Sequence, residues 1–279
     1  MGKFDNYILA SDIDGTFVGR NGTIHPYNIE KVRYFKQNGG KFLFSSGRNS
    51  KDIHTVVAGT EELINEACVL CNGAILYDIH TDEIENPVFL DNSKLIPMLI
   101  DIGEVFPDVG IRTSCDVGFI IRDTDEYIAN DLKRGGLMKY ATAVGIDEFY
   151  NYRHFKTVIT GDPARISVVG AYVREKYRGV FDFTMSSEKI LEVLKPGISK
   201  AYQLKYLRDK HAKTNPQIEL WCVGDFDNDI DMLKFADVAA CPENATDTVK
   251  SLCDIHLCKC VDGAVGQLID IIEAKQNRK

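Results

Sequence analysis

The chain lacks the long apolar segment that a membrane-spanning helix needs. Its longest uncharged apolar run, residues 67–77, is well short of the roughly 20 residues that cross a bilayer. The first residues also lack the apolar stretch of a signal peptide, because charges interrupt them at Lys3, Asp5, Asp12 and Asp14. We therefore expect a cytoplasmic protein that has no membrane partner.

Positive charge is scarce as well. The chain carries 33 lysines and arginines against 41 aspartates and glutamates, a net charge of −8. Nucleic acids and anionic membranes are bound by basic stripes, and the one basic cluster, 275–279, is interpreted as a solvated tail. We therefore expect no nucleic-acid partner. The apolar content of 44% and the length of 279 residues predict one large globular domain or two medium ones.

A complete zinc-binding motif is missing, although the chain has eight cysteines. Cys68 and Cys71 form a C-x₂-C pair inside an apolar run, and Cys258 and Cys260 are the other close pair. No second C-x₂-C or H-x₃-H completes a tetrahedral ligand set. Reduced, mostly buried thiols are the better interpretation.

Apolar runs alternate with amphipathic segments at both ends of the chain. Strands are expected at 6–10, 41–45 and 68–71, with helices between them, and this order predicts a doubly wound parallel sheet. The pattern resumes with expected strands at 190–194, 217–223, 238–240 and 255–257 and a closing helix over 266–274. Ligands of such sheets bind at the carboxyl ends of the strands.

The middle of the chain changes character. Residues 75–87 predict a hairpin, and residues 90–187 mix helices with shorter strands. We therefore expect a discontinuous α/β core made of 1–89 and 188–279, with 90–187 as an inserted α+β unit. Five basic residues of this unit could reach an anionic substrate, although solvated surface positions are the expectation for most: Arg112, Arg122, Lys133, Arg134 and Arg153.

Carboxylates follow two of the predicted strands directly. Asp12 and Asp14 come after the first strand, and Asp225 and Asp229 follow the strand at 217–223. Carboxylates at the mouth of a buried strand need a cation, a proton or hydrogen-bond donors. An ordinary strand-end turn is the alternative for either cluster alone. Neither cluster has the glycine and glutamate of an EF-hand, so together they indicate a Mg²⁺ site.

Groups suited to phosphate accompany these carboxylates. Ser46 and Gly47 follow the second strand and provide a hydroxyl and backbone N–H groups near a helix start. Asn72 follows the third strand, and Lys200 provides a cation. Taken singly, Ser46 is more often a cap and Lys200 a solvated lysine. Their occurrence together and in this order favours a phosphate site.

This ordered set resembles the haloacid dehalogenase superfamily of phosphatases. The residues that carry the resemblance are 12–16, Ser46 before Gly47 and Arg48, Lys200, and 224–229. The long insertion between the second and third motifs resembles the Cof-like branch with a type IIB cap. The implied fold is a Rossmann-like doubly wound parallel sheet with an inserted α+β cap. Ser46 departs from the usual threonine but keeps the hydroxyl.

The resemblance implies a role for each motif residue. Asp12 would be the nucleophile that forms an aspartyl-phosphate, and Asp14 the general acid and base. Mg²⁺ would be held by Asp12, the main-chain carbonyl of Asp14 and Asp225. The remaining assignments are phosphate binding by Ser46, Gly47, Lys200 and Asn228, and a position for Asp229 beside Lys200 or a metal-bound water.

The implied activity is Mg²⁺-dependent hydrolysis of small phosphomonoesters, with sugar phosphates favoured. Two alternatives stay open at this point. A sugar phosphomutase would use the same acids but return the phosphoryl group to a sugar. A non-catalytic regulator that binds phosphorylated metabolites would be expected to lack Asp12 or Asp14, and both are present.

Overall fold

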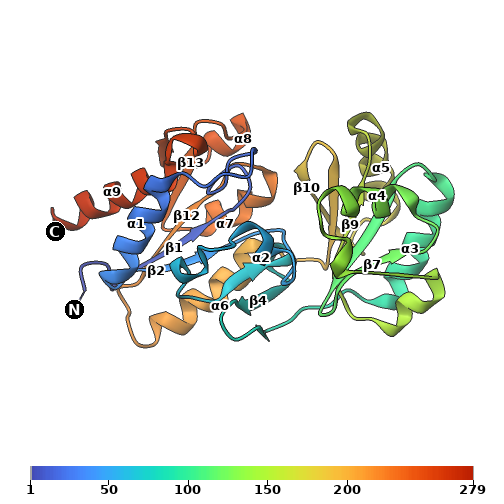
Figure 1. The fold of residues 1–279 in the computed structure, drawn as a ribbon, viewed down its shortest axis with the longest axis horizontal. Helices are drawn as coiled ribbons and strands as arrows, with labels where there is room; N and C mark the ends of the chain where they lie inside the picture. The colour runs from blue at the N-terminus through green and yellow to red at the C-terminus, as the bar shows by residue number, and fades with distance from the viewer. Residues whose placement is uncertain (1, 279) are drawn as a thin grey trace.

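The computed structural model describes residues 2–278 and shows two units side by side (Figure 1). The unit that contains both chain ends is the core. The second unit, which we call the cap, comprises the elements from α3 to β11 and is inserted into the core. No helix among residues 2–278 combines the length and the apolar character needed to cross a bilayer.

The core is built on a five-stranded sheet in the order β14-β13-β12-β1-β2, and all neighbours are parallel. Alternate residues of β1 join different apolar clusters, Tyr7 and Leu9 on one face and Ile8 and Ala10 on the other. A parallel sheet covered on both faces explains why its strands are apolar throughout. The predicted doubly wound α/β fold is confirmed. The strands are β1 (Tyr7–Ser11), β2 (Lys41–Phe44), β12 (Glu219–Val223), β13 (Val238–Pro242) and β14 (Ile255–Leu257).

Helices cover both faces of this sheet. Apolar residues of α1 and α9 pack in the cluster of Tyr7 and Leu9, and those of α6 and α7 in the other cluster. The first helix begins with Pro26 at a position where its missing N–H costs nothing. The core helices are α1 (Pro26–Gln37), α2 (Ile53–Val56), α6 (Lys200–Ala212), α7 (Ile230–Phe235), α8 (Asp247–Lys250) and α9 (Ala264–Gln276).

The third predicted strand occupies a different place from the one expected. β3 (Cys68–Leu70) touches the core sheet through a single parallel bridge, between Ser45 and Val69. Its main pairing is antiparallel to β4 (Ile75–Asp78), which pairs with β5 (Glu83–Glu85). The predicted hairpin is therefore present, and it draws β3 into a small sheet of its own.

The cap contains a six-stranded mixed sheet in the order β10-β11-β9-β6-β7-β8. Helices α3 and α5 pack with Ile111, Ile159 and Leu191 on one face of this sheet. The opposite face of its central strands points toward the core. The cap elements are α3 (Asn92–Val105), β6 (Gly110–Cys115), β7 (Gly118–Arg122), α4 (Glu126–Arg134), β8 (Ala141–Val144), β9 (His154–Thr160), α5 (Pro163–Lys176), β10 (Asp182–Ser187) and β11 (Ile190–Leu194).

The placement of β11 corrects one prediction. The run at 190–194 is expected from the sequence to return the chain to the core, but it pairs with β9 and β10 in the cap sheet. A short antiparallel hairpin holds it there, and an apolar run alone does not distinguish the two sheets. The start of the second core segment therefore moves from 188 to the turn after Leu194. The division into 1–89 with 188–279 and 90–187, corrected in this way, stays a prediction as a division into domains.

Candidate active site

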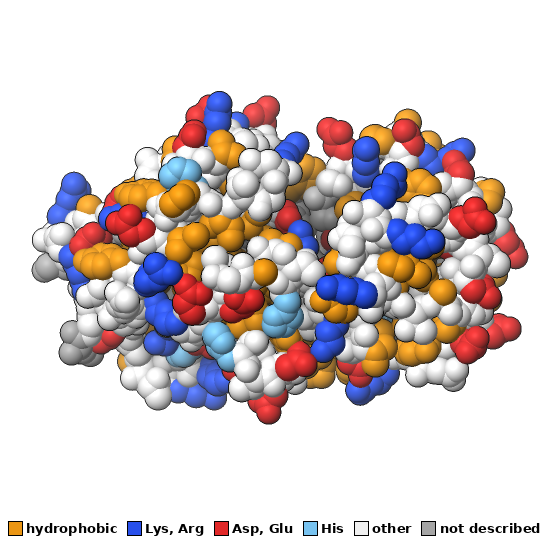
Figure 2. Space-filling view, viewed as in Figure 1, with side chains coloured by type: hydrophobic (Ala, Val, Ile, Leu, Met, Phe, Trp, Pro, Cys, Tyr) orange, Lys and Arg blue, Asp and Glu red, His pale blue; other side chains and the backbone are white. Residues whose placement is uncertain are grey.

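The predicted motif residues lie at one edge of the core sheet, facing the cap. Asp12 follows β1, Ser46 follows β2 and Asp225 follows β12, and these three strands are neighbours. Parallel strands end at the same edge, so residues far apart in the sequence come together there. A cavity of about 600 Å³ lies against this edge, lined by residues of both units. Figure 2 shows the hollow between the two units.

Three buried carboxylates form the centre of this edge. One oxygen from each of Asp12, Asp225 and Asp229 lies within 4.8 Å of the other two. Burial raises the pKa of Asp12 well above its usual value, and neighbouring carboxylates add to this rise. Burial, together with Asp229, raises the pKa of Asp225 to about 7. Closely spaced oxygen ligands with excess negative charge suit a hard divalent cation.

Lys200 provides the positive charge within this cluster. Its side chain is completely buried, and its Nζ donates to Asp12 Oδ1 (2.7 Å) and Asp229 Oδ1 (2.6 Å). Burial alone would lower the pKa of Lys200, but the two carboxylates raise it above its usual value. The other oxygen of Asp229 accepts the backbone N–H groups of Asp225 and Phe226. Asp229 therefore orients both Lys200 and the loop after β12.

Asp14 occupies a different environment from Asp12. Its side chain is 57% exposed, and it accepts two hydrogen bonds from Arg48, Nε to Oδ2 at 2.8 Å and Nη2 to Oδ1 at 2.7 Å. Arg48 also lies 3.9 Å from Asp52. A bidentate guanidinium pair fixes the orientation of a carboxylate. No role for Arg48 is predicted from the sequence, although its position directly after Ser46 and Gly47 is a usable signal.

Ser46 and Asn228 line the cavity beside the carboxylates, and Asn72 is hydrogen-bonded to both. Ser46 is buried, and its Oγ accepts the N–H of Arg48. Asn72 adopts a left-handed backbone (φ +54°), and its N–H donates to the Ser46 carbonyl. Asn228 Nδ2 donates to Asn72 Oδ1 at 3.3 Å. Asn72 Nδ2 is buried and has no hydrogen-bond partner among residues 2–278, so a donor is left for a ligand.

Two glycines permit close approaches in this site. Gly15 has φ +89°, and a Cβ there would lie 2.4 Å from Asp225 Oδ2. A Cβ at Gly47 would lie 3.0 Å from Glu192 Oε1 and 3.3 Å from Lys156 Nζ. Gly47 therefore lies directly under the cap, and Gly15 allows the first strand end to pack on Asp225.

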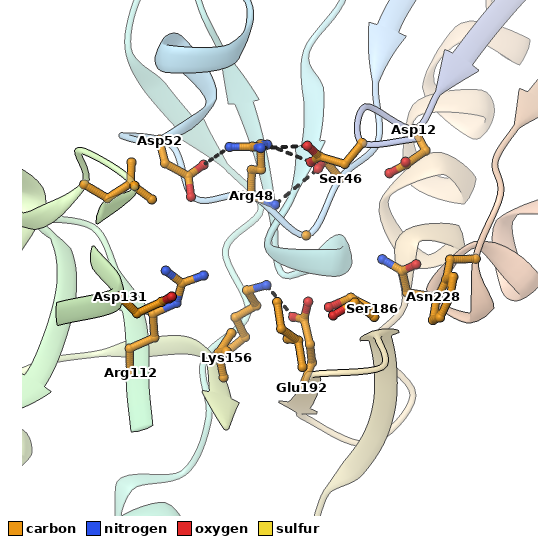
Figure 3. Close-up of a pocket in the computed structure, with 18 of the residues that line it drawn as sticks. Asp12, Ser46, Arg48, Asp52, Arg112, Asp131, Lys156, Ser186, Glu192 and Asn228 are labelled. Carbon is orange, nitrogen blue, oxygen red and sulfur yellow. Dashed lines mark hydrogen bonds and ion pairs between the residues drawn. The ribbon is translucent and has the colours of Figure 1, made fainter. Parts of the chain in front are cut away.

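The wall of the cavity opposite the core comes from the cap sheet. Figure 3 shows Arg112, Lys156 and Glu192 extending from this sheet toward the core residues. Lys156 and Glu192 form a buried ion pair. Neither residue is among those predicted from the sequence, although a glutamate inside the apolar run at 190–194 is a usable signal. Of its five basic candidates, Arg112 and Arg134 line the cavity, whereas Arg122, Lys133 and Arg153 are absent from its lining.

Residues 9–269 match the family model of haloacid dehalogenase-like hydrolases. The chain belongs to this family. This hydrolase is 23% identical over 256 residues to the 5-amino-6-(5-phospho-D-ribitylamino)uracil phosphatase YitU of Bacillus subtilis, covering 88% of this chain and 90% of that protein. It is 21% identical over 269 residues to the pyridoxal phosphate phosphatase YbhA of Escherichia coli, covering 94% and 97%.

Solved structures show the same fold for this hydrolase. A HAD/COF-like hydrolase from Plasmodium vivax aligns with a TM-score of 0.82 at 21% identity, covering 98% of this chain and 97% of that one. The subclass IIB sugar phosphatase BT4131 aligns with a TM-score of 0.80 at 16% identity, covering 95% and 98%. The resemblance to the Cof-like, type IIB branch and the predicted class of enzyme, a phosphatase of this superfamily, are confirmed.

Proposed function

We propose that this hydrolase is a Mg²⁺-dependent phosphomonoesterase that acts on small phosphorylated metabolites, with sugar phosphates favoured. The observation that carries the proposal is the contrast between two carboxylates at one cavity. Asp12 is buried and bonded to Lys200, whereas Asp14 is exposed to the cavity and held by Arg48. Two acids in different environments suit two different roles in one reaction.

In the first step, the oxygen of Asp12 that Lys200 does not hold attacks phosphorus. A bond from this oxygen to phosphorus forms, the bond from phosphorus to the ester oxygen breaks, and the product is an aspartyl-phosphate. Asp14 gives a proton to the departing alkoxide, which leaves as the alcohol. Arg48 donates to both oxygens of the ionised Asp14 carboxylate, so the oxygen that carries the proton for this transfer must leave its bond to Arg48.

In the second step, water hydrolyses the aspartyl-phosphate. Asp14, now deprotonated, takes a proton from the water as its oxygen bonds to phosphorus. The bond between phosphorus and Asp12 breaks, inorganic phosphate leaves, and the original protonation states return. Asp14 can serve as acid and then as base because its side chain lies outside the buried cluster of carboxylates.

The carboxylates of Asp12 and Asp225 and the main-chain carbonyl of Asp14 would hold the Mg²⁺ ion. When bound, the ion supplies positive charge that offsets repulsion between the nucleophile and the phosphate. The raised pKa values of Asp12 and Asp225 support this ligand set, because burial, with a smaller contribution from neighbouring carboxylates, disfavours their charged forms, which a bound cation would stabilise. Phosphoryl oxygens would be bound by Ser46, the Gly47 N–H, Lys200 and Asn228.

The named relatives support a small phosphomonoester as substrate. YitU is named for a phosphorylated ribitylaminouracil and YbhA for pyridoxal phosphate. Hydrolysis is favoured over the mutase and regulator alternatives because both relatives carry the name phosphatase and because both acids are present.

The test is phosphate release from a panel of phosphorylated metabolites and from p-nitrophenyl phosphate, with Mg²⁺ and with a chelator. We expect turnover that depends on Mg²⁺ and a loss of about 10⁴-fold or more in Asp12→Asn, because no nucleophile remains. Full activity of this variant would overturn the proposal. Phosphorus NMR checks the mutase alternative, which requires an isomerised sugar phosphate in excess of free phosphate.

A further inference from the structure

A row of cavity-lining side chains crosses the three central strands of the cap sheet. Arg112 on β6 is paired with Val158 on β9, and Val158 is paired with Glu192 on β11. Directly paired residues of neighbouring strands share a face, and all three line the cavity. Lys156 lies two residues before Val158 and therefore on the same face. These side chains lie opposite the phosphate site, where the leaving group of the substrate would bind.

The other two cationic side chains of this wall, Lys156 and Arg134, have carboxylate partners in ion pairs. Lys156 is paired with Glu192, and Arg134 lies 3.5 Å from Asp131. Within the described part of the chain, Arg112 makes neither an ion pair nor a hydrogen bond through its guanidinium, and its Nε is buried without a partner. The guanidinium lies over the Phe119 ring, 4.9 Å from its centroid, which fixes its plane.

The nearby carboxylate of Asp52 interacts electrostatically with Arg112, but its hydrogen bond and its ion pair lie within the core. Its Oδ1 accepts the backbone N–H of Asn49 at 3.1 Å and lies 3.9 Å from Arg48. Asp52 therefore closes the loop that carries Arg48. A buried guanidinium N–H, such as that of Arg112 Nε, is costly when it lacks a hydrogen-bond acceptor, unless a ligand supplies one.

We infer that Arg112 binds a second anionic group on the leaving group of the substrate, either a carboxylate or a further phosphate. This inference rests on the proposed function. The planar fork of arginine matches the oxygens of a carboxylate or phosphate. A neutral polyol offers Arg112 only uncharged acceptors, whereas an anion forms the stronger, charge-assisted hydrogen bonds.

The test uses matched substrates that differ by one anionic group. Sorbitol 6-phosphate and 6-phosphogluconate differ by exchange of a terminal hydroxymethyl group for a carboxylate, as do glycerol 3-phosphate and 3-phosphoglycerate at a shorter length. Glucose 6-phosphate and glucose 1,6-bisphosphate test a second phosphate. We expect kcat/KM to be about 10-fold or more higher for the anionic member of at least one pair, the range of a charge-assisted hydrogen bond. The pair that shows the larger difference in kcat/KM identifies the second anionic group as a carboxylate or a phosphate.

Variants then connect the preference to Arg112. In Arg112→Gln, we expect kcat/KM for the favoured anionic substrate to fall by about 10- to 100-fold, so that its ratio to the neutral substrate approaches one. Arg112→Lys keeps part of the ratio because the charge remains without the fork. Arg134→Gln is the matched control, since this arginine also lines the cavity but has Asp131 as a partner; it should keep the ratio.

Two results would overturn the inference. One is a wild-type enzyme that hydrolyses both members of every pair with equal kcat/KM. The other is an Arg112→Gln variant that loses activity equally on both members, which indicates a structural role. Failure of the proposed function is distinguishable, because the wild type would then release no phosphate from p-nitrophenyl phosphate or from any member of the pairs.

Discussion

The core and the cap each bury a lysine at the cavity, and the two lysines differ in their partners. Lys200 in the core is fully buried and bonded to two carboxylates, Asp12 and Asp229. Lys156 in the cap has a 5% exposed side chain and forms an ion pair with one carboxylate, Glu192. The core cluster keeps excess negative charge, whereas the cap pair is neutral by itself.

This difference indicates that the core and the cap have separate roles. Excess carboxylates in the core suit a cation and a phosphate, which any substrate of this class brings. The cap presents neutralised charges and Arg112, which suit recognition of one particular leaving group. If the core carries out the phosphoryl transfer and the cap selects the substrate, substitutions in the two units should have different effects.

The largest expected effect is the loss of the acid and base in the core. Asp14→Asn should lower kcat by about 10²- to 10⁴-fold on a sugar phosphate, because the alkoxide then leaves without a proton. The first step on p-nitrophenyl phosphate should be less affected, since nitrophenolate leaves easily. Rapid-mixing kinetics should show a burst of nitrophenolate followed by slow turnover. An equal loss on both substrates, with no burst, would contradict the assigned role.

The next effect concerns stability in the core. Lys200→Met leaves Asp12 and Asp229 buried without their cation, so the free energy of unfolding should fall by about 5 kcal/mol, the upper end for breaking a buried pair. Denaturant unfolding measures this change. Lys205→Met, at an exposed lysine of the same helix paired with Asp209, is the control and should cost less than about 1 kcal/mol. Equal stability of the two variants would contradict the prediction.

The corresponding substitution in the cap should lower the free energy of unfolding less, and a second substitution should restore most of the loss. Lys156→Met leaves one buried carboxylate, Glu192, and should lower the free energy of unfolding by about 3 kcal/mol. Adding Glu192→Leu removes that carboxylate and should restore most of the loss, because an apolar pair replaces a buried ion pair. Activity on p-nitrophenyl phosphate should survive in the double variant if the cap selects and the core catalyses. Loss of this activity together with retained stability would break the comparison.

The smallest expected effect is a pH dependence located in the cap. Burial lowers the pKa of His154, whose Nε2 lies 3.0 Å from the Phe149 carbonyl oxygen. Below about pH 6.5 the unfolded chain binds a proton that the folded state resists, so the free energy of unfolding falls as the pH decreases. His154→Gln keeps a donor but cannot titrate, so thermal unfolding should show a smaller acid loss. His80→Gln, at an exposed histidine of the core, is the control, and a matching change there would contradict this assignment.

Much of the core could be predicted from the sequence because its signals are local and ordered. The apolar strands at 6–10 and 217–223 end in carboxylates, and the order of Asp12, Ser46, Lys200 and Asp225 placed them at one sheet edge. The cap offered no such order. Its strands are short, and its charged residues resemble solvated ones until the pairing of strands assigns each to a face.

The sequence by itself determined the parallel core, its two-faced apolar burial and the carboxylates at its strand ends, since these follow from periodicity and strand direction. The fold was needed to show that β11 belongs to the cap and that Arg48 holds Asp14. It was also needed to show that Lys156 pairs with Glu192 beside Arg112, whose Nε has no hydrogen-bond acceptor among residues 2–278. These contacts depend on the pairing register of the strands and on how the cap packs against the core. The sequence of a strand specifies which side chains share a face of the sheet, but the residues that pack against that face decide which charges are neutralised.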